Sequence, residues 1–245
     1  FCLPIDHDFG IDNGDRTYKY RQQTGKYFVN FIGEDWRSPM AKRALAGEGV
    51  YGVKLFDFDR TDGHALVPDK LAGIDADLPP TSPLAGNKTV AVFVLDVRTN
   101  KSPWERAYKE DGDFLGERQW QWFEESIRRS SASINVIVNG LQVHGLRFPD
   151  PKFAEDWNKF PTSQRRLYNA VLNSNVEAPI LVSGDVHMAQ LSRRDCVSSR
   201  KKKRSLVEIT TSGMTHSWGT NMIADPRLFT KSLLNSYLSH LCRTS

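Results

Sequence analysis

Alternation between strongly apolar runs and amphipathic helical patterns constrains the fold of this chain more than any other feature. Five runs have the length and apolar content of β-strands: residues 49–59, 89–98, 133–143, 178–187 and 205–213. Helical patterns at 113–130 and 163–174 separate three of them, and the first places Trp120, Phe123 and Ile127 on one face. Strands and helices that alternate in this way predict a layered α/β sheet with helices on its faces.

Length, composition and charge fit one globular domain. The 245 residues are 39% hydrophobic and 25% charged, which is ordinary for a chain with one sizeable core. The longest apolar runs fall short of the roughly 20 residues that a membrane-spanning helix needs, so no transmembrane segment is predicted. The net charge of +4 is mild, and we interpret the basic run 200–204 as a solvated loop between strands. No nucleic acid partner is expected; phosphate contact through that run is the alternative.

Two segments lie outside the alternating pattern. Residues 61–88 are rich in Pro, Gly and Asp and predict a long inserted loop. Near the end of the chain, large apolar residues recur at four-residue steps: Phe229, Leu233, Tyr237 and Leu241. This spacing predicts a helix within 225–243 that docks on the domain, and partner binding through the same stripe is the alternative. We therefore divide the chain into a domain at 1–219 and a C-terminal helix at 220–245.

The sequence leaves the cellular compartment open. Cys2, Cys196 and Cys242 lie far apart, without the spacing of a zinc site or a disulfide framework. The triplets that begin at Asn87 and Asn100 match the N-glycosylation pattern, which leans toward a secretory setting.

Polar side chains follow the predicted buried strands where each strand ends, the usual location of sites in α/β sheets. They are Asp96, Arg98, Asn139, Gln142, His144, Asp185 and His187. In Asp185-Val186-His187, an oxygen donor and a nitrogen donor alternate across one residue, just after a glycine. This pattern suits a divalent or trivalent metal. The alternative is a turn carboxylate beside a surface histidine.

A second acidic cluster opens the chain. The run IDHDFGIDNGD at 5–15 contains Asp6, His7, Asp8 and Asn13, and no Lys or Arg follows Asp6 within nine residues. Such a cluster repels itself unless a cation neutralises it or water solvates it. We therefore interpret this cluster either as a metal site or as an acidic surface loop.

Six further blocks follow the opening run in order: VFVLDVRTN, FLGERQWQWFEESI, INVIVNGLQV, EDWNKFPTSQRRL, ILVSGDVHMAQLSR and EITTSGMTHSWG. Together they resemble successive segments of the PhoD-like metallophosphatases, the alkaline phosphatase D branch of the calcineurin-like metallophosphoesterases. The resemblance covers nearly all of residues 5–219.

The resemblance implies a four-layer α-β-β-α sandwich with several metal ions between the strand ends. Asp6, Asp185 and His187 match metal-ligand positions of the family. Gln142 or Asn139 stands where relatives outside this branch have a further ligand histidine. Calcium and iron are the metals that the resemblance implies, with manganese or magnesium as alternatives.

Three more residues acquire roles through the same resemblance. His7 matches the histidine that protonates the leaving group, Asn13 lines the metal or substrate pocket, and Arg98 meets a phosphate bidentately. The implied reaction is hydrolysis of a phosphate ester by metal-activated hydroxide, with a general acid at the departing oxygen.

One departure from the family affects both fold and function. The earlier half of such enzymes, with its Gly-Asp-x-x-Tyr block, has no counterpart here, and we interpret GDRTY at 14–18 as coincidence. We therefore expect the chain to begin in mid-domain, where a strand delivers Asp6 and His7, and the N-terminal half of the fold to be missing. The alternative function is a catalytically incomplete remnant that binds a partner or acts as a scaffold. Oligomeric state is not predicted.

Overall fold

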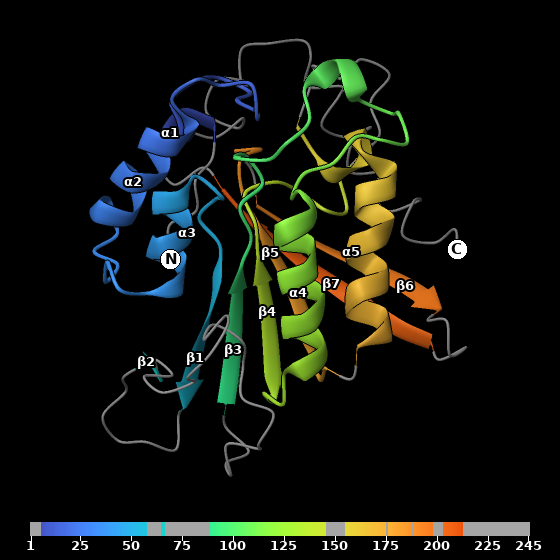
Figure 1. Ribbon diagram of the computed structural model, residues 1–245. Helices are drawn as coiled ribbons and strands as arrows, with labels where there is room; N and C mark the ends of the chain where they lie inside the picture. The colour runs from blue at the N-terminus through green and yellow to red at the C-terminus, as the bar shows by residue number, and fades with distance from the viewer. Residues whose placement is uncertain are drawn as a thin grey trace, which may run out of the picture.

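A computed structural model describes residues 6–57, 65–66, 89–145, 155–174, 176–187, 189–197 and 203–212. Within these ranges the strands form one seven-stranded sheet in the order β2-β1-β3-β4-β5-β7-β6 (Figure 1). The strands are β1 Gly52–Asp57, β2 Ala65–Leu66, β3 Thr89–Val94, β4 Ile134–Val138, β5 Pro179–Ser183, β6 Ala189–Val197 and β7 Lys203–Thr211. β3, β4, β5 and β7 run parallel, and the outer strands are antiparallel to their neighbours.

The helices are α1 Asp6–Phe9, α2 Arg21–Phe31, α3 Pro39–Ala46, α4 Glu117–Arg129 and α5 Pro161–Asn173, with 3-10 turns at Trp104–Arg106 and Trp157–Lys159. In α3 the Ser38 hydroxyl accepts a hydrogen bond from the Ala41 N–H, and Gly47 ends the helix with φ 74°. The predicted mixed α/β class is confirmed. None of the described helices is long and apolar enough to cross a bilayer.

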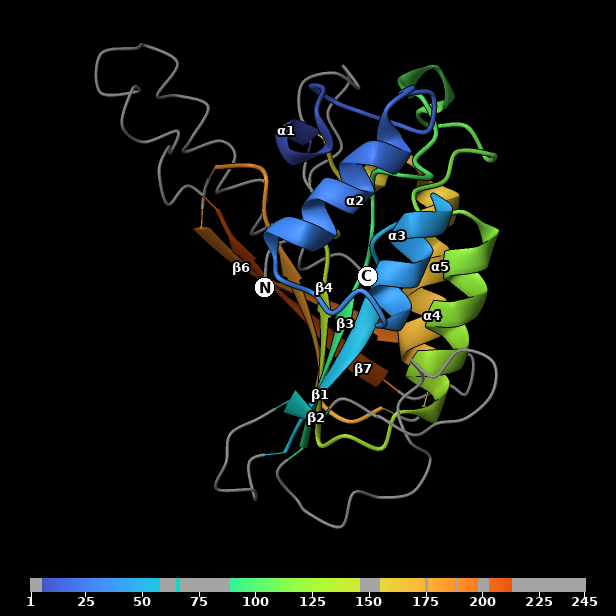
Figure 2. The ribbon, with the colours of Figure 1, turned by 60° about the vertical axis from the view of Figure 1, so that its left-hand side comes forward.

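α4 and α5 lie side by side on one face of the sheet (Figures 1 and 2). Trp120, Phe123 and Ile127 of α4 are buried there, as their helical spacing predicts. The Phe123 ring meets Phe93 of β3 edge to face at 6.0 Å. Arg166 of α5 pairs with Glu117 and Glu124 of α4, so charge as well as packing joins the two helices.

α2 and α3 pack on the opposite face, but only over part of it. Phe28 and Val29 of α2 form a small core with Val92 and Val94 of β3. A second sheet is not found among the described residues. The four-layer sandwich and the missing N-terminal half therefore stay predictions.

Asp6 and His7 themselves lie in the short helix α1. The strand expected to deliver them would precede residue 6 and lies outside the described residues. The Gly10 N–H donates to the His7 carbonyl at 3.0 Å and closes the turn. Phe9 is buried against Tyr18, with ring centroids 5.5 Å apart. A single apolar residue in an acidic run anchors a turn, whereas a strand needs alternation.

Three further sequence predictions concern the last strand, the inserted loop and the C-terminal helix. The expected strand at 205–213 is β7, which begins at Lys203. Lys203 and Arg204 of the basic run are therefore part of the strand and not of a loop, and a second strand, β6, pairs with them and with the rest of β7. Of the loop expected at 61–88, only 65–66 are described, as β2. The expected C-terminal helix lies outside the described residues.

Phe123→Ala tests the packing of α4 on the sheet. Phe123 has no exposed surface, so its truncation leaves a cavity and is expected to lower the free energy of unfolding by about 3–5 kcal/mol. Urea unfolding measures this change. Gln121→Ala, at an exposed position of the same helix, is the control and is expected to have almost no effect. Equal stability of the two variants would contradict the packing described.

Candidate functional site

The parallel strands β3, β4 and β5 end at the same edge of the sheet, and α1 lies beyond that edge (Figure 1). Asp96, Asn139 and Asp185 follow these strands within a few residues. The edge therefore collects polar side chains from segments that are far apart in the sequence.

Asp96 organises the loop after β3. Its Oδ1 accepts hydrogen bonds from the N–H groups of Arg98 at 2.8 Å and Thr99 at 2.9 Å. Its Oδ2 accepts from the Val50 N–H at 2.7 Å and the Thr99 hydroxyl at 2.6 Å. Gly49 has φ +124°, and a Cβ there would lie 2.9 Å from Oδ2, so this close approach requires glycine. Asp96 is a structural anchor that fixes the start of the Arg98 segment.

Arg98 is completely buried and lies between two carboxylates. Its guanidinium forms an ion pair with Glu155, and Nη2 lies 4.0 Å from Oδ1 of Asp185. A buried charge is stable only when it is paired. The two contacts tie the loop after β3 to residue 155 and to the turn after β5.

Lys101 extends this cluster to the N-terminal segment. Its Nζ lies 3.1 Å from Oε1 of Glu155 and donates to the Asn13 carbonyl at 2.9 Å. The Lys101 carbonyl in turn accepts from the Arg16 N–H at 3.0 Å. Burial lowers the pKa of Lys101, while the charge of Glu155 opposes that shift. Arg98, Glu155 and Lys101 therefore form one buried ion cluster.

The Asp185-Val186-His187 turn has an unusual backbone. Asp185 has φ 71° and His187 has φ 52°, values that residues other than glycine rarely adopt. The Val186 N–H donates to the Gly184 carbonyl at 2.9 Å, and the His187 N–H donates to the Ser212 hydroxyl at 3.1 Å. Such strain is held in place by its surroundings and is found most often at functional sites.

The structure brings some of the predicted site residues together. Asn13, Arg98 and Asp185 meet through the buried ion cluster. His7 is exposed on α1, and the side chain of Asp6 lies outside the described part of the structure. Asn13 contributes its backbone carbonyl, while its side chain donates to Asp12 at 2.9 Å.

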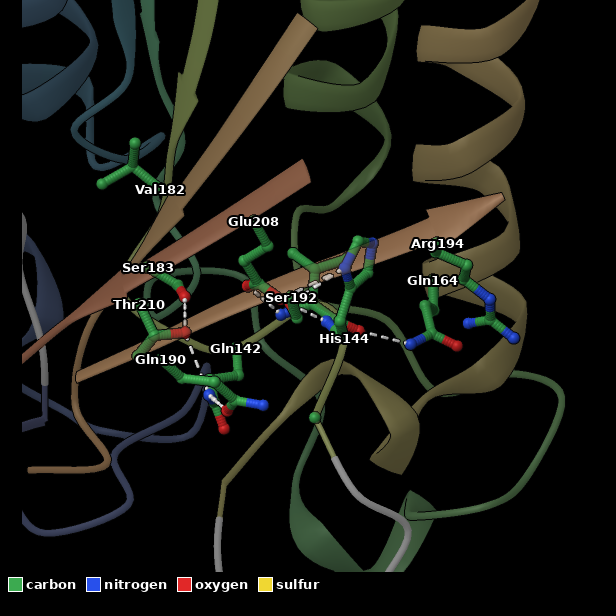
Figure 3. A network of polar contacts seen from close by, with 12 residues as sticks. Gln142, His144, Gln164, Val182, Ser183, Gln190, Ser192, Arg194, Glu208 and Thr210 are labelled. Carbon is green, nitrogen blue, oxygen red and sulfur yellow. Dashed lines mark hydrogen bonds and ion pairs between the residues drawn. The ribbon is translucent and has the colours of Figure 1, made fainter. Parts of the chain in front are cut away.

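Gln142 belongs to a neighbouring network (Figure 3). Its Nε2 donates to Oε1 of Gln190 on β6 at 2.8 Å and to the Thr210 hydroxyl on β7 at 2.9 Å. Asn139, the other residue considered for this role, accepts a hydrogen bond from the Trp157 indole at 2.9 Å. Both side chains hold the loop after β4 in place, and their role as ligands stays a prediction.

Glu208 lies at the centre of the network in Figure 3. It is almost completely buried and accepts the N–H groups of Val143 and His144, both at 2.6 Å. Burial raises the pKa of Glu208. The His144 Nδ1 lies 3.2 Å from the Ser192 hydroxyl, and burial, with the charge of Arg194, lowers the pKa of His144 to about 4.

Sequence reasoning missed Glu155, Lys101 and Glu208. One signal for Glu208 was available, because its position in β7 alternates with outward-facing residues and therefore faces the core. Glu155 and Lys101 lie in irregular segments that no periodicity marks.

The described residues do not by themselves fit a metal centre. Among them, no group of three or more His, Cys, Asp or Glu side chains could hold a metal ion. Asp185 faces Arg98, and Glu155 contacts both Arg98 and Lys101, so cationic side chains neutralise these two carboxylates.

Comparison with known protein families shows to which family this chain is related. The model of the PhoD-like phosphatase family matches residues 85–234, more than half of the chain. This chain belongs to the PhoD-like phosphatase family. The matched range contains β3, β4, β5, β6 and β7 and most of the candidate site.

Two named relatives have partial similarity to this member of the PhoD-like family. Alkaline phosphatase D from Bacillus subtilis (strain 168) is 26% identical over 97 residues, which are 38% of this chain and 17% of that protein. A solved structure described as the structure of PhoD aligns with a TM-score of 0.43 and 19% identity, over 51% of this chain and 27% of that chain. The chain thus spans well under a third of the relatives that it matches.

Arg98→Met tests the buried ion cluster. The change leaves Glu155 buried with only Lys101 as a partner, so the free energy of unfolding is expected to fall by about 3–5 kcal/mol. Chemical denaturation measures the loss, and Arg128→Met, which removes an exposed pair with Glu125, serves as the control. If Arg98→Met unfolds at the same denaturant concentration as the native chain, the cluster does not stabilise the fold.

His144 predicts a pH dependence of stability. Its pKa of about 4 in the folded chain lies below the ordinary value of 6.5, so the unfolded state binds the proton first as pH falls. Stability from this group is full above pH 6.5 and falls by about 3 kcal/mol as pH drops to 4. Unfolding curves of the native chain and His144→Phe between pH 7 and 4 isolate this contribution. Parallel pH profiles would contradict it.

Proposed function

We propose that this chain takes part in the hydrolysis of phosphate esters, monoesters or diesters, at the edge where β3, β4 and β5 end. Family membership supports the reaction class, and the ion cluster supports the location. The observation that carries the location is the chain of contacts from Asn13 through Lys101, Glu155 and Arg98 to Asp185. These contacts join the two segments that the resemblance assigns to the site.

Each candidate residue has a defined task in this proposal. Asp185 presents a carboxylate that is partly exposed, with 18% of its side chain accessible. Arg98 is fully buried behind it, so we assign Arg98 to hold Asp185 and the local charge in place, rather than to a direct phosphate contact. His7 is exposed on α1 and is the proposed proton donor to the leaving oxygen, the usual task of a histidine in general acid catalysis.

We further propose that the reaction depends on a bound metal ion. The donors on this chain would be Asp6, Asp185 and His187, with Asn13 and Gln142 as further oxygen ligands. Calcium, iron, manganese and magnesium all accept such oxygen-rich sets, and a bound metal supplies a polarised phosphoryl oxygen and an activated water. The described side chains alone do not form a complete metal centre.

Hydrolysis of p-nitrophenyl phosphate and bis(p-nitrophenyl) phosphate by the full chain, with elemental analysis of the same sample, tests the proposal. Asp185→Asn is expected to lower the rate about 100-fold, because it removes an anionic oxygen donor of the proposed metal site. Asp195→Asn is the matched control, because Asp195 is an exposed carboxylate on β6 that pairs with Arg193. Hydrolysis that is unchanged in Asp185→Asn would reject the proposed site.

A further inference from the structure

The two outer strands of the sheet differ in length. β2, on one side, has two residues, whereas β6, on the other side, has nine residues from Ala189 to Val197 (Figure 1). Among the described residues, no strand pairs with the outer edge of β6. The backbone N–H and C=O groups along such an edge can pair with a strand of another chain, and proteins commonly keep exposed edges short for that reason. Within the described ranges, β6 therefore offers the longer edge for pairing.

Two opposite charges lie two residues apart on this edge strand. Arg193 and Asp195 are on the same face of β6, because side chains alternate along a strand. Their side chains are 65% and 57% exposed, and the Arg193 Nε donates to Oδ1 of Asp195 at 2.8 Å. The same oxygen accepts a hydrogen bond from the Ser205 hydroxyl on β7 at 2.6 Å. The edge therefore presents one cation and one anion at fixed positions.

Only a few registers are open to two antiparallel copies of this strand. Directly opposite residues in an antiparallel pair either both form hydrogen bonds or both do not, so the two-fold axis between two copies of β6 must lie at a residue. An axis at Arg194 places Arg193 of each copy opposite Asp195 of the other and pairs residues 191–197 of both. An axis at 193 or at 195 places like charges opposite each other, which is destabilising. An axis at 192 leaves Arg193 opposite Leu191. The charges therefore favour the axis at Arg194.

In this register, Arg194 lies next to its own copy at the axis. Its side chain is on the α5 side of the sheet, where Nη1 donates to the Tyr168 hydroxyl at 3.1 Å. The guanidinium carbon lies 5.1 Å from the centroid of the Tyr168 ring. These contacts hold the charge over the sheet and away from its outer edge. The repulsion between the two copies of Arg194 is thereby reduced, and it acts on the face opposite to Arg193 and Asp195.

We propose that β6 pairs antiparallel with β6 of a second copy of this chain, about a two-fold axis at Arg194. The four charges then alternate around a square, since each Asp195 keeps its own Arg193 and faces that of the second copy. An interface of residues 191–197 is smaller than the roughly 1,600 Å² that a stable complex buries, so the dimer is weak and forms at micromolar concentrations and above. The inference does not depend on phosphate ester hydrolysis, because none of residues 191–197 is a proposed site residue.

Sedimentation velocity of the full chain across roughly 1 to 200 μM, a range that covers weak complexes, tests the pairing. The native chain is expected to change from monomer to dimer as concentration rises. Arg193→Asp places carboxylates opposite each other, and Asp195→Arg places guanidinium groups opposite each other, so each variant is expected to dimerise about 10-fold more weakly. Arg128→Asp, at an exposed position of α4, makes the same charge change as Arg193→Asp and is expected to dimerise like the native chain.

An equimolar mixture of the Arg193→Asp and Asp195→Arg chains tests the register. In a mixed dimer the two acidic side chains of one chain face the two basic side chains of the other. A dimer is therefore expected to form at concentrations at which neither variant dimerises alone, and its recovery also shows that both variants are folded. A native chain that stays monomeric, single variants that dimerise as the native chain does, or a mixture that stays monomeric would each overturn the proposal.

Discussion

The buried ion cluster of Arg98, Glu155 and Lys101 is the interaction on which the candidate site depends. Three charged side chains leave water together, and each is stable there only because the others are present. The cluster joins the N-terminal segment at Asn13 to the turn at Asp185, which no strand pairing connects. Asp96 holds the loop that carries Arg98 and Lys101 in one conformation, because it accepts the N–H groups of Arg98 and Thr99.

The two faces of the sheet differ in a way that follows from the register. On one face α4 and α5 bury Phe93, Ile137 and Leu181 of the central strands completely, and polar residues on that side, such as Glu208, find partners within the chain. On the other face, the core that α2 and α3 form with the sheet includes residues of β1, β3 and β4. The candidate site lies at the edge of the sheet where β3, β4 and β5 end.

The central strands and helices could be predicted from the sequence, because the spacing of their apolar residues indicates which side chains are buried. The run at 89–98 is apolar on both sides and becomes the buried strand β3, and the spacing of Trp120, Phe123 and Ile127 fixes the inner face of α4. α2 was missed because it exposes Tyr27 and Phe31 and contains Gly25. β6 was missed because an edge strand with charged outward residues resembles a loop.

The candidate site was predictable only in part. Arg98 and Asp185 were found from residue type and position at strand ends, and Asn13 through the resemblance to the family. The structure brings these three segments together. Glu155 and Lys101 could not be found this way, because both lie in irregular segments and their partners are distant in the sequence. Lys101 contacts Asn13, 88 residues away, and Glu155 pairs with Arg98 and Lys101. Apolar–polar alternation along a strand predicts which residues are buried, but it does not predict which buried charged residues contact one another.

Hydrogen exchange followed by mass spectrometry on Glu155→Gln tests the central claim most directly. If the ion cluster holds both parts of the site, exchange rises at 11–16 and at 184–187 together, while α4 and α5 keep their protection. Exchange that stays unchanged at either segment would show that the two parts of the site are held independently of the cluster.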